Sequence, residues 1–158
     1  MIIKGITYED FVNYKLPSMF IAMPSCTFKC DKACGRPVCQ NGPLASAPDF
    51  NVPIESIVQR YIGNTISKAV VFGGLEPFDS ADALLLCIER FRVYGVEDDI
   101  VIYTGYNKDE IDAGTLRALK DFGNIIIKYG RFVPDQQPHL DEVLGVSLAS
   151  DNQYAERL

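Results

Sequence analysis

The chain is poor in several features that would indicate a membrane or secreted protein. It has no apolar run near the roughly 18 residues that a membrane-spanning helix needs, and its first residues lack the basic start and apolar stretch of a signal peptide. It has one histidine, His139, in a proline-flanked segment where we expect a surface position rather than a base or a metal ligand. We therefore expect a cytoplasmic protein without membrane contact.

Positive charge is also scarce. The 158 residues include 15 Lys and Arg against 21 Asp and Glu, which gives a net charge of -6. A nucleic-acid-binding domain normally shows a basic patch or stripe, so this class is disfavoured. The length suits one domain over residues 1–158 with a core of its own, and no internal repeat or low-complexity tract divides it.

Cysteine is the residue type that is concentrated. Four of the five cysteines fall within fourteen residues, at Cys26, Cys30, Cys34 and Cys39. Thiolates this close repel one another unless a metal or disulfides neutralise them, and disulfides do not persist in the cytoplasm. The fifth, Cys87, lies on the apolar side of a predicted helix and is expected in the core.

The spacing of these cysteines favours a cluster over a single ion. Zinc ligands typically come as two well-separated pairs, whereas here all four lie in one unbroken segment. Three cysteines can bind three irons of a four-iron cluster and leave the fourth iron open. The pattern indicates an iron–sulfur site first, a structural zinc site second and disulfides third.

Apolar runs alternate with amphipathic segments along the chain. Strands are predicted at 18–23, 69–72, 99–104 and 124–128, and helices follow Pro53, an N-cap at Asp79, and a capping box of Asn107 with Glu110. This order predicts an α/β fold, either a partial (β/α) barrel or an open parallel sheet. An irregular loop is expected at about 24–52, and an irregular tail from about 132 that covers a sheet edge.

The unusual residues follow the predicted strands, where parallel sheets gather their chemistry. Gly73 and Gly74 permit close approach of a ligand, and Glu76 could bind an ammonium group. Tyr103, Thr104 and Gly105 could contact a nucleoside, and Lys128 and Arg131 a carboxylate or phosphate. Each of these segments could also be a plain strand end or turn.

Taken together, these segments resemble the radical S-adenosylmethionine (radical SAM) enzymes, and more closely the activating proteins of anaerobic ribonucleoside-triphosphate reductase. The matching segments lie in the family's order at 6–12, 26–34, 73–77, 103–106, 129–132 and 150–153. Relative to the family, the third cysteine stands one residue late at Cys34, and Leu75 is an added residue. Cys39 is therefore a possible substitute ligand.

The resemblance implies a 4Fe-4S cluster held by Cys26, Cys30 and Cys34 that reductively cleaves S-adenosylmethionine. It places the cofactor against Gly73, Gly74, Glu76, Pro77, Tyr103, Thr104 and Gly105. The implied product is a glycyl radical on a large partner, an anaerobic ribonucleotide reductase, with electrons from a donor such as a flavodoxin or ferredoxin. Two alternatives remain: a radical SAM enzyme that acts on a small molecule or peptide, and a non-catalytic module with a four-cysteine zinc site.

Overall fold

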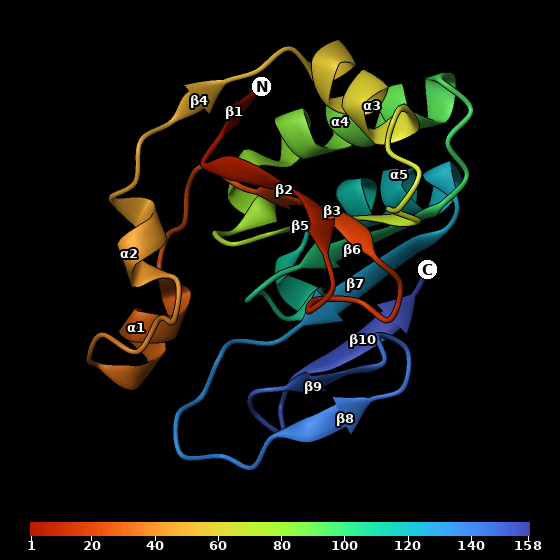
Figure 1. Ribbon diagram of the computed structural model, residues 1–158. Helices are drawn as coiled ribbons and strands as arrows, with labels where there is room; N and C mark the ends of the chain where they lie inside the picture. The colour runs from red at the N-terminus through yellow and green to blue at the C-terminus, as the bar shows by residue number, and fades with distance from the viewer.

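A mixed six-stranded sheet forms the centre of the protein in the computed structural model, which describes all residues 1–158 (Figure 1). The strand order is β10-β7-β6-β5-β3-β2. The inner four strands are parallel, and β2 and β10 pair antiparallel at the two edges. The strands are β2 Gly5–Asp10, β3 Ser18–Ala22, β5 Ala69–Gly73, β6 Asp99–Tyr103, β7 Ile125–Tyr129 and β10 Tyr154–Arg157. An open α/β fold is confirmed, but its sheet is mixed rather than all parallel.

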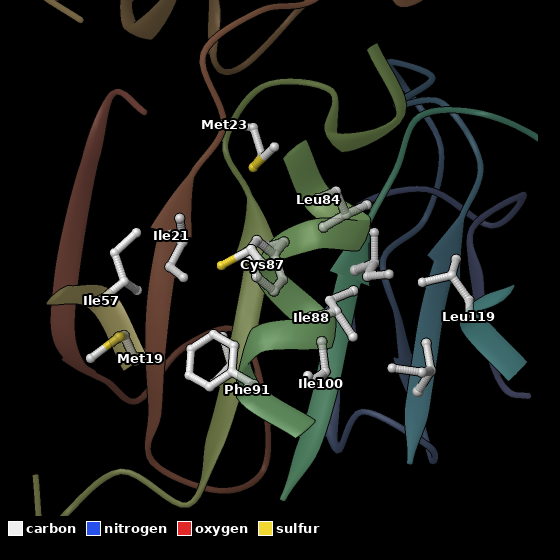
Figure 2. Packing of buried hydrophobic residues seen from close by; sticks show 14 of the residues in the cluster. Met19, Ile21, Met23, Ile57, Leu84, Cys87, Ile88, Phe91, Ile100 and Leu119 are labelled. Carbon is white, nitrogen blue, oxygen red and sulfur yellow. The ribbon is translucent and has the colours of Figure 1, made fainter. Parts of the chain in front are cut away.

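Three helices cover one face of the sheet (Figure 1). They are α3 Ile54–Ile62, α4 Ala81–Val93 and α5 Ala113–Phe122. Their inner sides pack on the sheet in a cluster of 21 buried residues, in which Figure 2 shows Cys87, Ile88 and Phe91 of α4 against the strands. Cys87 is fully buried, as the sequence predicts. Each large apolar side chain buried in this way contributes about 1.5–3 kcal/mol to stability.

The opposite face carries a smaller apolar cluster of seven buried residues, which includes Tyr14, Val71 and Leu148. A hairpin of β8 His139–Asp141 and β9 Val146–Leu148 packs there in place of helices. The tail from 132 is therefore not irregular as predicted, since it forms this hairpin and then β10 at the sheet edge. Three-residue strands are too short to show a period in the sequence. His139 is half-buried in β8 rather than exposed.

The segment 24–52 also has more regular structure than predicted. It contains α1 Lys29–Cys34, α2 Gly42–Ala45 and β4 Phe50–Asn51, and β4 pairs with β1 Ile2–Ile3. No residue of α1 or α2 is buried, so neither helix has the apolar period that a sequence pattern could detect. In Figure 1 this part of the chain lies beside the sheet, apart from the three covering helices.

The predicted capping box is present but caps a different element. Asn107 and Glu110 exchange their hydrogen bonds around the short 3-10 helix η2 Lys108–Glu110. The helix α5 begins later, after Asp112, whose carboxylate accepts a hydrogen bond from the Thr115 amide. None of the helices combines the length and the apolar character needed to cross a membrane.

Candidate functional site

A cavity of about 410 Å³ lies at the carboxyl ends of the parallel strands. Five parts of the chain form it: the β2–β3 loop with β3, the cysteine segment, the turn after β5, the end of β6, and the end of β7 with the C-terminal tail. Its walls include Cys26, Cys30, Cys39, Gly74, Leu75, Glu76, Tyr103, Thr104, Gly105, Lys128, Gly130 and Gln153. The predicted functional edge of the sheet is thus hollow.

Three of the four clustered cysteines line this cavity. They are Cys26, Cys30 and Cys39, whereas Cys34 is not among the lining residues. Burial raises the pKa of the Cys26 thiol to about 11 and raises the pKa of Cys30, and negative charge on Cys39 adds to both effects. The raised pKa values favour the protonated form of the Cys26 and Cys30 thiols when no metal is bound, and binding of iron must release these protons.

Hydrogen bonds from the turn after β5 hold the cysteine segment next to the sheet. The Glu76 amide donates to the Ser25 carbonyl at 2.9 Å, and the Thr27 amide donates to the Asp79 carboxylate at 2.6 Å. The Tyr106 hydroxyl donates to the other oxygen of Asp79. Asp79 was predicted as the N-cap of α4, but it lies in the 3-10 helix η1 Pro77–Ser80 and Ser80 is the N-cap. The Asp79 carboxylate instead binds the cysteine segment through the Thr27 amide.

The two glycines at the end of β5 and in the turn after it are closely packed, and Gly74 also has a left-handed backbone. Gly74 has φ +78, and a Cβ there would come within 2.8 Å of the Leu44 side chain. A Cβ at Gly73 would lie 3.2 Å from both Phe20 and Tyr103. Gly74 lines the cavity, whereas Gly73 and Pro77 do not, although both were predicted as cofactor-binding residues. Gly73 therefore acts in the structure by allowing the strand to pack closely.

Glu76 is the buried carboxylate of the cavity, with 5% of its surface exposed. Its Oε1 accepts from the Thr104 hydroxyl at 2.6 Å and from the Phe78 amide at 3.1 Å, and its Oε2 accepts from the Gly105 amide at 2.9 Å. Burial raises the pKa of Glu76, and these three hydrogen bonds oppose that shift. A carboxylate offers about four acceptor positions, so Oε2 keeps one for a further donor.

Lys128 supplies the positive charge of the cavity. Only 6% of it is exposed, and its ammonium donates to the Gly130 carbonyl at 2.9 Å. Burial lowers its pKa to about 8, while the neighbouring Cys30 and Glu76 act in the opposite direction. An ammonium has three donors, so two remain for an anionic group. Arg131, predicted for a similar role, bonds Glu110 at 2.6 Å instead and does not line the cavity.

The end of β6 forms another wall. Tyr103, Thr104 and Gly105 all line the cavity, as their predicted contact with a nucleoside requires. The Tyr103 hydroxyl donates to the Asn13 carbonyl at 2.5 Å, which ties this wall to the loop between β2 and β3. The sequence interpretation missed several polar lining residues: Asn13, Gln40, Asn41 and Ser147. Asn13, Gln40 and Asn41 lie outside regular elements and Ser147 lies in the three-residue strand β9, so no periodic pattern identifies them.

The donor set fits an iron–sulfur cluster better than a single ion. No three His, Cys, Asp or Glu side chains converge on one point where a metal ion could be held. A zinc ion needs its sulfur ligands at about 2.3 Å from one centre, whereas a cluster presents its irons at separate corners. Three cysteines that could act as ligands and the buried ammonium of Lys128, which could balance the charge of an anionic cluster, line the same cavity.

Comparison with known proteins gives one result. No curated protein and no solved structure shows significant similarity to the chain. A family model described as a 4Fe-4S single cluster domain matches residues 18–153, which cover the whole cavity wall from β3 to Gln153 apart from Asn13. With this match over most of its length, the chain belongs to the 4Fe-4S single cluster domain family.

Proposed function

We propose that the protein is a radical SAM activating enzyme that forms a glycyl radical on a partner anaerobic ribonucleotide reductase. The observation that carries the proposal is the position of Glu76. Its carboxylate, with one acceptor position free, lies on the same cavity as the cluster-binding cysteines. A cofactor that binds an open iron of the cluster and also presents an ammonium group matches this pair of features.

The cavity offers a complementary group for each part of S-adenosylmethionine. The free position on Glu76 Oε2 accepts the ammonium, and Lys128 donates to the carboxylate. Tyr103 and the Gly105 backbone lie where the nucleoside is expected. A volume of about 410 Å³ lies within the range of about 300–1,000 Å³ that holds ligands of this size.

When bound, the cluster and S-adenosylmethionine supply a one-electron cleavage of a carbon–sulfur bond, which yields methionine and a 5′-deoxyadenosyl radical that takes hydrogen from a glycine. The chain's own residues orient the cofactor and exclude water. The electron comes from a separate donor such as a flavodoxin or ferredoxin. We expect a glycine-bearing loop of the partner to reach the cavity, which lies at the carboxyl ends of the parallel strands.

The direct test is anaerobic reconstitution with iron and sulfide. We expect a reducible 4Fe-4S signal in electron paramagnetic resonance (EPR) that changes when S-adenosylmethionine is added, and its loss in Cys30→Ala. Glu76→Gln should keep the cluster and weaken the response to S-adenosylmethionine. Tightly bound zinc without iron would contradict the proposal.

The partner is tested separately. The reduced protein and S-adenosylmethionine are incubated with an anaerobic ribonucleotide reductase, and a glycyl radical is sought by EPR. Formation of 5′-deoxyadenosine without a glycyl radical on any candidate reductase would favour a small-molecule or peptide substrate.

A further inference from the structure

We propose that Cys39, rather than Cys34, is the third ligand of the cluster, together with Cys26 and Cys30. The first observation is that Cys39 lines the cavity beside the other two and Cys34 does not. This inference rests on the cluster-binding part of the proposed function and is independent of the cleavage of S-adenosylmethionine. The resemblance in sequence implied Cys34 as the third ligand, whereas the position of Cys39 in the cavity wall favours Cys39.

The geometry of α1 explains why Cys34 is displaced. Cys30 and Cys34 lie four residues apart on one side of this helix, so Cys34 is about 6 Å further along the axis. Cys30 Sγ lies close to Gly105 of the cavity wall, at 3.6 Å from where a Cβ on that glycine would be. Cys34 is the last helical residue and lies beyond the cavity wall.

The chain then turns back toward the cavity. Gly35 ends α1 with φ +64, a left-handed conformation that glycine adopts without strain. The next residues bring Cys39 alongside the first turn of the same helix. The eight residues that separate Cys30 from Cys39 are thus taken up by a helix and a reversal, and a long sequence separation becomes a short distance in space.

Asp31 holds the returning segment in place. Its Oδ1 accepts hydrogen bonds from the Val38 amide and the Cys39 amide, both at 2.8 Å. On the other side of the ligand, the Gly42 amide donates to the Cys39 carbonyl at 3.2 Å. The backbone of Cys39 is therefore held on both sides, at a position where the residue lines the cavity. Asp31 is a positioning residue, next in sequence to one ligand and hydrogen-bonded to another.

The test compares Cys39→Ala with the matched variant Cys34→Ala. Each is reconstituted anaerobically, and bound iron and sulfide per chain are measured together with the EPR signal of the reduced cluster. We expect Cys39→Ala to lose the 4Fe-4S signal and most of the iron, and Cys34→Ala to match the wild type. Circular dichroism of the metal-free variants checks that both fold.

The other results each overturn the inference. Loss of the cluster in Cys34→Ala with retention in Cys39→Ala would restore the spacing-based set, while the proposed function would stand. Retention in both variants, or loss in both, would contradict the assignment of one ligand role to Cys39 alone. Absence of a cluster from the wild-type protein would overturn the inference and the proposed function together.

A second pair of variants tests the positioning without touching a cysteine. Asp31→Ala removes the acceptor for the Cys39 amide, whereas Asp31→Asn keeps an oxygen there. Loss of such supporting contacts typically costs 10–100-fold in metal affinity. We expect a chelator to remove iron about 10-fold faster from Asp31→Ala than from the wild type, with Asp31→Asn in between. Equal rates in all three would contradict the role of Asp31 and with it the proposed position of Cys39.

Discussion

The two faces of the sheet are built from the same strands but have opposite characters. In β7, Ile125, Ile127 and Tyr129 point into the large cluster under the helices, whereas Ile126 and Lys128 point to the other face. This alternation is the period of two along a strand. The face under the helices is closely packed with apolar side chains. The opposite face has a cavity at one end, with buried charged groups in its wall. The comparison indicates that stability resides mainly under the helices and chemistry on the opposite face.

The largest expected effect on stability comes from the helix face. Phe91 is fully buried and packs edge-on against Tyr61 with ring centroids 5.5 Å apart. Phe91→Ala should lower the free energy of unfolding by about 3–5 kcal/mol, as measured by urea denaturation of the metal-free protein. The matched variant Phe132→Ala, at a half-buried residue of the cavity wall, should cost clearly less. Equal losses of unfolding free energy in the two variants would contradict the inference that stability resides mainly under the helices.

Glu76→Gln should have a moderate effect on stability. An amide cannot accept at both of its terminal atoms, so the donor at one position loses its partner. The three donors to Glu76 lie in η1 and directly after β6, and an unsatisfied buried donor costs about 1–3 kcal/mol. Denaturation of the metal-free protein measures this loss. A loss as large as that of Phe91→Ala would show that the cavity face is also a main source of stability.

A smaller effect is expected at the amino end of β6. Asp99 accepts hydrogen bonds from Arg157 and Tyr14, and the bond from Arg157 is the main cause of its lowered pKa. Because the folded-state pKa lies below that of the unfolded chain, the stabilisation is present at neutral pH and is lost as the pH falls below about 4. Asp99→Asn should cost about 1 kcal/mol at pH 7.

The pH dependence provides the control for Asp99. The difference in unfolding free energy between Asp99→Asn and the wild type should shrink as the pH is lowered from 7 to about 3. The exposed Asp121 on α5 offers a matched change, and Asp121→Asn should show little difference at either pH. A deficit for Asp99→Asn that persists at low pH would mean that packing, rather than charge, causes it.

The smallest effect is expected on the outside of the helices. Arg90 of α4 and Glu55 of α3 form an ion pair at 3.5 Å, with 37% of the Arg90 side chain and 54% of the Glu55 side chain exposed to solvent. Solvent screens such a pair, so Arg90→Ala should change the free energy of unfolding by about 0.5 kcal/mol or less. A larger loss would show that this surface contact contributes to the packing of the helix face.

The sequence allowed the inner sheet to be predicted more completely than its edges. The runs at 69–72 and 124–128 are short, apolar and β-branched, and they became β5 and β7. The strand β2 was missed because it lies at the edge of the sheet and carries exposed polar residues between its half-buried ones, so it has no continuous apolar run. Helix α1 was missed because it buries no residue. Apolar periodicity in a sequence reflects which side chains are buried, so an element that buries few side chains cannot be predicted from it.

The candidate site was predicted in its parts rather than in its geometry. Strand order brings Glu76, Thr104 and the cysteine segment to one edge, and this follows from the parallel topology. The difference between Cys34 and Cys39 depends on a chain reversal at Gly35 and on two hydrogen bonds to Asp31. These contacts exist only in the folded segment, so the number of residues between the cysteines does not predict them.

The antiparallel strand β10 has a consequence for self-association. It pairs along the whole of β7, whose Ile-Ile-Ile run would otherwise present free amides and carbonyls at the edge of the sheet. Such an edge is a template for pairing with another chain. β10 itself carries Glu156 and Arg157, and charged side chains on an outer strand discourage further addition. Pairing of β10 with β7 therefore protects the protein from aggregation through the isoleucine-rich edge that β7 would otherwise expose.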